Sequence, residues 1–325
     1  MKVFIVGGTG FLGYHATLKF LEHGHEVDTI SIPDVNLGDW FPKKVGVKYG
    51  NAFEMTHDEL IKLFMGSDAI VYAVGPDDRF LPDAPAYEFF HERLVVACGK
   101  VIEAARDAGV KRCAILNSYF AYFDRIMPEL QLKEHHPYIK CRVEQADLCI
   151  NIGGDKMDVM ILELPYIFGT MPERMPLWKD IIVNSILKMK PWVFFFKGGS
   201  NMISVEHIAE SIVGAIERGK GGQRYPIGDE NLTWKQWIKI MLKAAGVNRR
   251  IITLPTWIGT ITGWYLRRKD KKKGKEAGLN HKLLFKDIQC RELFFDPTSS
   301  QQELGYTGGG LEESIIQTIK KCIES

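Results

Sequence analysis

The chain of 325 residues lacks an excess of charge of either sign. It contains 42 basic and 40 acidic residues, which gives a formal net charge of +2 at pH 7. Proteins that bind nucleic acid usually carry a strongly basic face that neutralises phosphates. The balanced composition therefore predicts a small-molecule partner rather than a nucleic acid.

Cysteine and histidine patterns that bind metals are also missing. The six cysteines include no CxxC pair, and they are interpreted as reduced thiols of a cytoplasmic protein. His135 and His136 are adjacent, but no further ligand follows at a metal-binding spacing. We predict no metal site and interpret the two histidines as flanking or capping a helix.

No apolar run approaches the roughly 20 residues that a membrane-spanning helix needs. The chain begins directly with the apolar segment 2–6, so no secretory signal is expected. The nearest candidate, residues 254–266, contains Pro255 and Gly259 and precedes the basic run 267–273. Such a segment can lie on an anionic membrane surface. It is more often a buried helix followed by a solvated loop, and membrane contact is not expected.

What the sequence does contain is a regular alternation of strand and helix signals in its first half. Strands are expected at 3–6, 26–32, 45–49, 69–74, 113–117 and 159–164, and helices at 11–23, after Thr56, at 87–108 and at 138–149. This alternation predicts a doubly wound parallel sheet, the Rossmann type of α/β fold. After Pro165 the pattern becomes irregular. We predict a Rossmann domain over residues 1–164 and a smaller α/β lobe over residues 165–325, with segments that return to the first domain.

A glycine-rich loop follows the first predicted strand and opens the first predicted helix. Its sequence is Gly7-Gly8-Thr9-Gly10-Phe11-Leu12-Gly13. Glycines allow a tight turn and let the backbone approach a pyrophosphate, and the helix N-terminus supplies free N–H groups. The loop therefore predicts a dinucleotide site.

With this loop the chain resembles the extended short-chain dehydrogenase/reductase family, also called the NAD-dependent epimerase/dehydratase family. Gly7, Gly10 and Gly13 match the family's GxxGxxG motif. Further matches are Ala73-Val74-Gly75 after the fourth strand, residues 104–112 before the fifth, residues 164–169 after the sixth, and weaker ones at 296–297 and 304–305. The resemblance implies NAD(P), with Thr9, Phe11, Leu12, Ala73, Val74, Gly75 and Pro165 also at the cofactor. It also implies that the smaller lobe binds substrate.

The end of the second strand normally distinguishes NAD from NADP. An acidic residue there binds the ribose hydroxyls of NAD, whereas a nearby Arg accepts the 2′-phosphate of NADP. Here the position is Ser31, followed by Ile32, so both the acid and the adjacent Arg are missing. Ser31 could donate to a phosphate without repelling it, and this favours NADP. Asn51, after the third strand, matches the residue that contacts adenine in the family.

The resemblance also implies a catalytic set of Ser, Tyr and a cation. Ser118 ends the fifth predicted strand, Tyr138 begins the next long helix, and Arg142 follows four residues later on the same face. The family usually has Lys where Arg142 stands. Arg keeps the positive charge that favours tyrosinate, but its planar fork differs from an ammonium group. Tyr122, four residues after Ser118, is the alternative tyrosine.

Two further departures concern the substrate. Leu94 aligns with an Asn that is common in the family, and Ser200 stands where sugar-nucleotide enzymes have an Arg that contacts the diphosphate. The sequence predicts an NAD(P)-dependent oxidoreductase or epimerase/dehydratase that acts on a hydroxyl or ketone carbon of a small molecule. A sugar nucleotide is one candidate substrate, although the missing Arg weakens it. The alternative is a non-catalytic, redox-sensing NAD(P)-binding protein, and a homodimer is left open.

Overall fold

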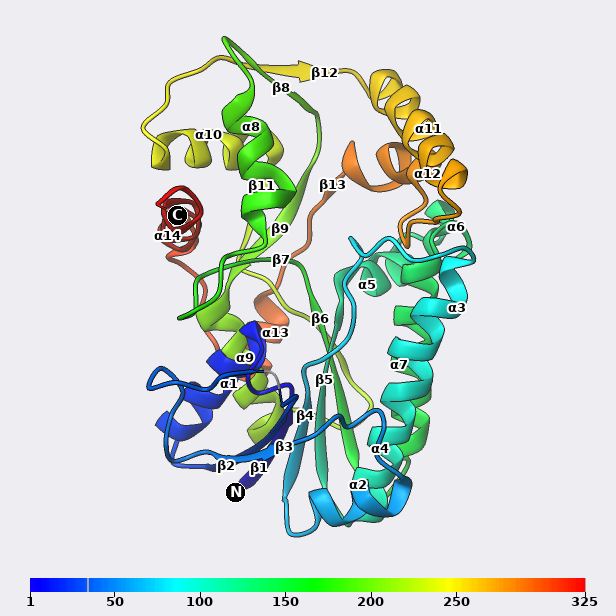
Figure 1. Cartoon of the computed structure of the whole chain (residues 1–325), viewed down its shortest axis with the longest axis vertical. Helices are drawn as coiled ribbons and strands as arrows, with labels where there is room; N and C mark the ends of the chain where they lie inside the picture. Colours follow the sequence, from blue (N-terminus) through cyan, green and yellow to red (C-terminus); the bar gives the residue numbers. More distant parts are fainter. Residues whose placement is uncertain (34, 325) are drawn as a thin grey trace.

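The computed structural model describes residues 1–33 and 35–324. Seven strands form its central sheet: β1 (Lys2–Val6), β2 (Glu26–Ser31), β3 (Gly46–Tyr49), β4 (Ala69–Tyr72), β5 (Arg112–Ser118), β6 (Asp158–Leu164) and β10 (Arg224–Pro226). Their order is β10-β6-β5-β4-β1-β2-β3, and all paired neighbours are parallel (Figure 1). The predicted doubly wound Rossmann fold is therefore confirmed.

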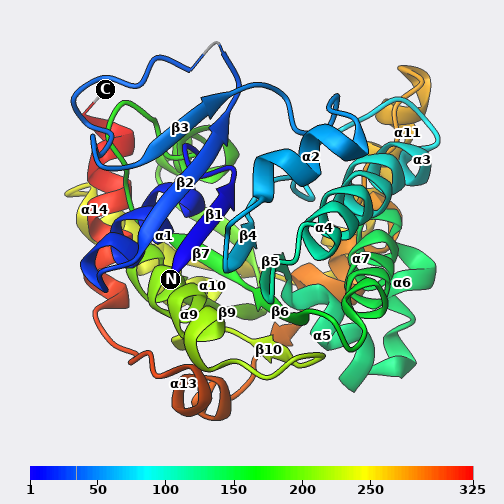
Figure 2. The same cartoon turned by 90° about the horizontal axis from the view of Figure 1, so that it is seen from below.

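Helices cover both faces of this sheet (Figure 2). One face is covered by α1 (Phe11–Glu22) and α9 (Val205–Arg218), and the other by α2 (His57–Phe64), α4 (Ala97–Asp107) and α7 (Pro137–Gly153). The side chains of β1 alternate between the two cores: Val3 and Ile5 pack with the first pair of helices, whereas Phe4 and Val6 pack with the second group. A strand buried on both faces reads as a continuous apolar run for this reason.

The helix expected at 87–108 is one helical run with a change of pitch. It consists of α3 (Ala86–Phe90), a π-helical stretch over His91–Val96, and α4. Between β5 and α7 the chain forms α5 (Tyr119–Ile126), a 3₁₀ turn over Pro128–Leu130, and α6 (Leu132–His135), which the sequence did not indicate.

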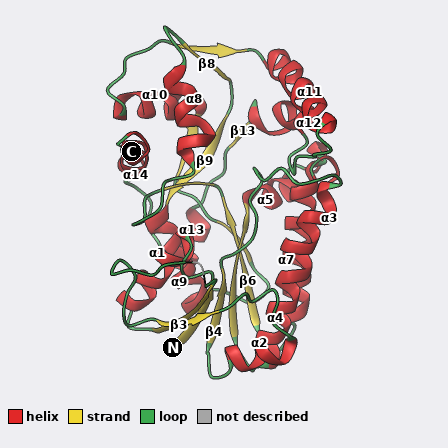
Figure 3. Cartoon of the chain, viewed as in Figure 1, coloured by secondary structure: helices red, strands yellow, loops and turns green. Residues whose placement is uncertain are grey.

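Much of the second half of the chain builds a smaller lobe from short strands and several helices (Figure 3). One sheet has the order β11-β9-β13, with β7 also paired to β9, and β8 pairs with β12. These strands are β7 (Tyr166–Phe168), β8 (Val193–Phe196), β9 (Gly199–Ser204), β11 (Glu230–Thr233), β12 (Ile251–Leu254) and β13 (Glu292–Leu293). The helices are α8 (Asn184–Lys188), α10 (Trp234–Ala244), α11 (Thr256–Lys272), α12 (His281–Leu284), α13 (Thr298–Leu304) and α14 (Leu311–Ile323), with π-helical stretches at Lys179–Val183 and Phe285–Gln289.

Two segments of the second half lie with the central sheet rather than with the smaller lobe. β10 pairs with β6 at the edge of the sheet, and α9 packs beside α1. The division at residues 164 and 165 stays a prediction.

The apolar segment at 254–266 differs from its predicted structure. It was expected to be a buried helix followed by a loop, but α11 continues through most of the basic run, to Lys272. Only Gly259, Gly263 and Asp270 of this helix are buried. The prediction was wrong because the helix packs through its two small residues, which leaves the large aromatic ones outside. In the part of the chain that is described, no helix is both long and apolar enough to cross a membrane.

Candidate active site

The glycine loop joins β1 to α1 and is shaped by two close approaches of the backbone. Gly7 has a φ of 94°, and a Cβ on it would lie 2.4 Å from Cγ1 of Val74. A Cβ on Gly13 would lie 2.1 Å from the carbonyl oxygen of Gly7. Both positions therefore require glycine. Gly10 is different, because a Cβ there would meet only the Gly7 oxygen, at 3.2 Å.

Gly10 is also the N-cap of α1, and no side chain caps this helix end. The first N–H groups of a helix lack partners within the helix, and they carry the positive end of its dipole. Gly10, Phe11 and Leu12 line a cavity of about 540 Å³, called here the inner cavity. This open, uncapped helix end fits the pyrophosphate of a dinucleotide.

A second cavity of about 430 Å³, the outer cavity, continues the inner one along the sheet edge. The two share Gly10, Ala73, Val74, Met171 and Arg174. Together the two cavities could hold an extended ligand, with one end at the outer strands β2 and β3 and the other end at β5. Gly7, Thr9, Ser31 and Asn51 line the outer cavity, and Gly75 and Pro165 line the inner one. Gly13, among the predicted cofactor residues, lines neither and serves the packing of the loop.

The polar side chains predicted to contact the adenosine end already have partners within the chain. Ser31 is buried, and its Oγ lies 3.2 Å from Oγ1 of Thr9. The Nδ2 of Asn51 donates to Glu54 at 2.8 Å, and its Oδ1 accepts from the N–H of Phe53 at 3.1 Å. Of the described residues that line the outer cavity, Arg174 is the only basic one.

Leu94, which aligns with an Asn of the family, is a core residue. It is fully buried, and a Cβ on Gly75 would lie 2.8 Å from its Cδ2. The loop after β4 therefore packs against an apolar side chain rather than an amide.

Ser118, Tyr138 and Arg142 all line the inner cavity. Ser118 is the last residue of β5, and its Oγ accepts a long hydrogen bond of 3.4 Å from the N–H of Phe120, which caps α5. Tyr138 lies in the first turn of α7, and its N–H donates to the carbonyl of Gly278 in the smaller lobe. The predicted set is thus brought together at the carboxyl end of β5, on the same cavity as the glycine loop.

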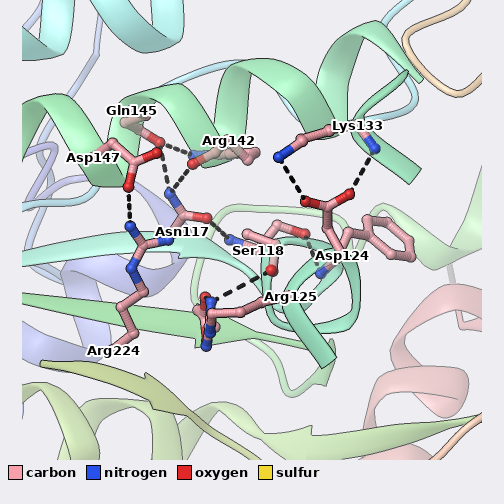
Figure 4. Close-up of polar contacts among 12 residues, drawn as sticks. Asn117, Ser118, Asp124, Arg125, Lys133, Arg142, Gln145, Asp147 and Arg224 are labelled. Carbon is pink, nitrogen blue, oxygen red and sulfur yellow. Dashed lines mark hydrogen bonds and ion pairs between the residues drawn. The ribbon is translucent and has the colours of Figure 1, made fainter. Parts of the chain in front are cut away.

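Arg142 is held by a buried network (Figure 4). Its Nε donates to the hydroxyl of Tyr138 at 2.9 Å, and its Nη1 donates to Oε1 of Gln145 at 2.9 Å and to the carbonyl of Leu116 at 3.3 Å. Asn117 donates from Nδ2 to the same Oε1 at 3.1 Å and to the carbonyl of Arg142 at 2.9 Å. The guanidinium of Arg142 therefore donates from one nitrogen to the Tyr138 hydroxyl and from another to Gln145 and Leu116, which hold it in place.

Burial raises the pKa of Tyr138 above its ordinary value. The positive charge of Arg142 and its hydrogen bond act in the opposite direction, whereas the carboxyl groups of Asp78 and Asp77 add to the rise. Tyr138 is accordingly protonated at neutral pH, as a proton donor must be. Arg142 limits how far the pKa of the phenol rises.

A charged loop that no sequence pattern indicated also lines the inner cavity. Asp77 and Arg79 form an ion pair at 2.6 Å, and burial raises the pKa of Asp78, which lies beside them. Tyr119 and Tyr166 line the same cavity, and burial raises the pKa of each hydroxyl. Only their position after the strands β4, β5 and β6 could have indicated them, because ligands in such sheets bind at the carboxyl ends of the strands.

Four residues singled out in the sequence lie away from the cavities. Ser200 is fully buried and donates to the hydroxyl of Tyr119 at 2.9 Å, so Tyr119 rather than Ser200 lines the inner cavity. Tyr122 packs against Phe295. His135 contacts Asp287 at 2.8 Å, and His136 accepts from the N–H of Asn280, so both link α6 and α7 to the smaller lobe.

The described residues include one group that could hold a metal ion, His23, His25 and Glu217. His23 follows α1, His25 precedes β2, and Glu217 lies in the last turn of α9. The group therefore lies near the amino end of β2, whereas the glycine loop lies at the carboxyl end of β1. The three residues form hydrogen bonds among themselves, with 3.1 Å from His23 and 2.9 Å from His25 to the same Glu217 oxygen. This group is separate from the inner cavity.

Comparison with known proteins agrees with this geometry. Residues 7–167 match a family model described as NAD(P)H-binding. The chain is 23% identical, over 99% of its length and 96% of the relative's, to a 4-hydroxy-2-methyl-3-oxo-4-farnesyl-3,4-dihydroquinoline-1-oxide ketoreductase of Stigmatella aurantiaca. It is 22% identical, over 79% of its length and 72% of the relative's, to a decarboxylating sterol-4-alpha-carboxylate 3-dehydrogenase of Mus musculus.

Among solved structures, the fold is similar to that of UDP-glucose 4-epimerase from Thermotoga maritima. The TM-score is 0.69 with 13% identity, and the match covers 100% of this chain and 99% of that one. The chain thus carries an NAD(P)-binding domain, and its predicted resemblance to the extended short-chain dehydrogenase/reductase family is confirmed. The predicted class, an NAD(P)-dependent oxidoreductase or epimerase, agrees with the activities named for these proteins.

Proposed function

We propose that this protein is an NAD(P)-dependent oxidoreductase that interconverts a ketone and a secondary alcohol. The observation that carries the proposal is the convergence of Ser118, Tyr138 and the glycine loop on one cavity. The glycine loop and the segment Ala73–Gly75 would hold the dinucleotide, which supplies two-electron redox chemistry when bound. Ser118 and Tyr138 would bind the oxygen of the reacting carbon.

Tyr138 handles the proton in this proposal. Reduction of a ketone requires a proton donor at the oxygen, and a buried, protonated phenol is suited to that role. In the reverse direction Tyr138 must lose its proton, and the adjacent Arg142 stabilises the tyrosinate. Ser118 orients the same oxygen from the end of β5.

The cavity favours a substrate with an apolar body. Beside its charged residues, the cavity is lined by large aromatic and aliphatic side chains, among them Phe120, Tyr166, Met175, Leu177 and Trp178. The Arg79 side chain is engaged by Asp77, and Ser200 offers no cation at the position of the diphosphate-binding Arg. The two curated relatives are named for a farnesylated quinoline and for a sterol, which supports this substrate class over a sugar nucleotide.

The cofactor is proposed to be NADP, bound at least as tightly as NAD. Ser31 at the end of β2 places no carboxylate against a 2′-phosphate. Because the outer cavity has only Arg174 as a basic lining residue among those described, the preference should be small.

The runner-up is a non-catalytic NAD(P)-binding protein. It is favoured by Arg142 in place of the usual Lys and by the apolar Leu94 in place of Asn. A protein that only binds the dinucleotide would not need the contact from Arg142 to the Tyr138 hydroxyl.

A screen of ketones and alcohols followed by NAD(P)H absorbance separates these proposals. Products must be analysed in parallel, because an epimerase shows no net change of cofactor. We expect Tyr138→Phe to lower turnover by roughly 100- to 10,000-fold, the range that general acid–base catalysis contributes, with cofactor affinity nearly unchanged. Tyr122→Phe removes the same hydroxyl from a tyrosine outside the cavity, and it should retain wild-type turnover.

The result that would reverse this assignment is full activity in Tyr138→Phe and a loss in Tyr122→Phe. If the wild-type protein binds NAD(P) and turns over no substrate class in either direction, the non-catalytic alternative is preferred.

A further inference from the structure

The outer side of α11 carries a row of large apolar side chains. Trp257, Ile261, Trp264 and Tyr265 are 63%, 59%, 53% and 62% exposed. Their spacing of four, three and one residues places them on one face of the helix. Large apolar side chains gain substantially from burial, so three aromatic ones and one isoleucine exposed on one face mark a surface that binds something apolar.

The opposite side of α11 is fixed to the protein. A Cβ on Gly259 would lie 2.6 Å from the ring of Phe285, and one on Gly263 would lie 2.0 Å from the carbonyl oxygen of His281. After the helix, Gly274 accepts from the N–H of Ala84, which anchors this end as well. The helix lies at the periphery of the smaller lobe (Figure 1), and its aromatic side chains are exposed there.

A basic cluster continues the aromatic face at the C-terminal end of α11. It consists of six exposed residues, Arg267, Arg268, Lys269, Lys271, Lys272 and Lys273. The acidic residue within this run, Asp270, is buried and accepts a 2.7 Å hydrogen bond from His281. No carboxylate of the described residues forms an ion pair with any of the six cations. The chain as a whole has a net charge of only +2, so the C-terminal end of α11 carries a strong local excess of positive charge.

We propose that α11 docks on the surface of an anionic lipid bilayer. Tryptophan and tyrosine side chains prefer the headgroup region, where the ring is partly apolar and the polar atom stays hydrated. Lysine and arginine beside them are attracted to anionic headgroups. An amphipathic helix with aromatic and aliphatic residues on one face and basic residues around them binds in this way without crossing the membrane.

The charge argues against a second copy of the chain as the occupant. In a two-fold dimer the same surface faces itself. Such a contact through α11 would bring six cations of one protomer near six of the other, with no exposed carboxylate in the run to balance them. An anionic bilayer complements both the aromatic and the basic part of the surface.

Sedimentation with lipid vesicles tests the proposal on the intact protein. Vesicles of phosphatidylcholine with phosphatidylglycerol should bind it, and vesicles of phosphatidylcholine alone should bind it at least 10-fold more weakly. Binding should weaken as salt is raised, because surface charges are screened. Bromine-labelled lipids should quench tryptophan fluorescence in the wild type and much less in a Trp257→Ser/Trp264→Ser variant.

Paired variants separate the aromatic from the basic contribution. Arg267→Glu/Lys271→Glu should weaken binding about 30-fold or more, because one basic residue near an anionic surface contributes about fivefold. Trp257→Ser/Trp264→Ser should weaken it roughly 10- to 100-fold through lost apolar burial. The matched controls are Lys43→Glu/Lys44→Glu, which makes the same charge change at exposed lysines, and Met65→Ser/Ile126→Ser, which removes exposed apolar side chains elsewhere. Both should bind as the wild type does.

The proposal is overturned if the wild type does not bind anionic vesicles or if the controls lose binding as strongly as the α11 variants. It is also overturned if the Trp257→Ser/Trp264→Ser change converts a dimer to a monomer in analytical ultracentrifugation without affecting vesicle binding. In that case α11 is an interface between two copies.

Discussion

The glycine loop and the Tyr138 site border the same cavity, but contacts of different range hold them in place. The loop is fixed largely by its own backbone, since Gly13 packs on the carbonyl of Gly7, and its contacts outside these seven residues include Val74, just after β4, and Thr29 in β2. Tyr138 is fixed from far along the chain: its backbone bonds to Gly278, and its hydroxyl bonds to Arg142, which in turn bonds to the carbonyl of Leu116. The cofactor loop therefore depends on local backbone geometry, whereas the proton-handling site depends on tertiary packing.

The largest effect is expected in the glycine loop, where Gly10 borders the cavity and Gly13 is packed against the backbone. Gly10→Val adds a side chain on the cavity side, where little protein is near, so the fold should persist while dinucleotide binding weakens at least 100-fold. Gly13→Val places the same side chain against the Gly7 backbone, and overpacking there should lower the melting temperature markedly. Titration of NADPH by fluorescence and thermal unfolding measure the two effects.

A Gly10→Val protein that still binds NADPH normally would exclude the open helix end as the phosphate site. Equal thermal stability of Gly13→Val and the wild type would show that the loop is less tightly packed than the backbone approach indicates.

The same contrast explains what could be predicted from the sequence. The glycine loop, the Thr56 capping box and the apolar strands depend on residues close together in the chain, and each has a pattern that can be recognised. The two-residue strand β13 and the three-residue strands β7 and β10 have no such pattern, because their neighbours in the sheets supply their structure.

The site residues divide in the same way. Tyr138 and Arg142 are recognisable because they are four residues apart on one helix. Asp78 and Tyr166 become cavity residues only because the sheet brings the ends of β4 and β6 together, a distance of more than 80 residues along the chain. The exposed face of α11 was misjudged for a similar reason, since an apolar segment does not reveal which side its neighbours cover.

A smaller effect is expected at Arg142, where charge and anchoring can be separated. Arg142→Ala should lower turnover by roughly 10- to 100-fold, the loss expected for one charge-assisted hydrogen bond. Arg142→Lys keeps the charge beside Tyr138 but offers one nitrogen instead of the fork that also holds Gln145. It should lose less activity than Arg142→Ala, with a small decrease in melting temperature.

The pH dependence of these variants gives the sign of the charge effect. In the alcohol-oxidation direction the rate should rise with pH, because Tyr138 must be deprotonated and its pKa lies above the ordinary value. Loss of the cation in Arg142→Ala destabilises tyrosinate and raises that pKa further, so the rise should move to higher pH. Arg142→Lys should leave it near the wild-type position. Identical profiles for the Ala and Lys variants would show that Arg142 does not act through its charge.

The smallest effect is expected at Ser31. Its position at the end of β2 suggests a contact with the cofactor, whereas the structure shows its hydroxyl bonded to neighbouring residues. If Ser31 donates to a 2′-phosphate, Ser31→Ala should weaken NADPH binding and leave NADH binding unchanged. Its Oγ already lies 3.2 Å from Thr9 and 3.3 Å from the carbonyl of Ile32, so we expect a change of about threefold or less for both cofactors, within the range of one neutral hydrogen bond. Ser31→Asp adds a negative charge at the end of β2 and should reduce NADPH affinity at least 10-fold relative to NADH through repulsion. Parallel calorimetric titrations of NADPH and NADH decide the matter: a selective loss of NADPH in Ser31→Ala would assign the hydroxyl to the phosphate, whereas an unchanged ratio in Ser31→Asp would mean that the 2′ position of the cofactor does not lie near this residue.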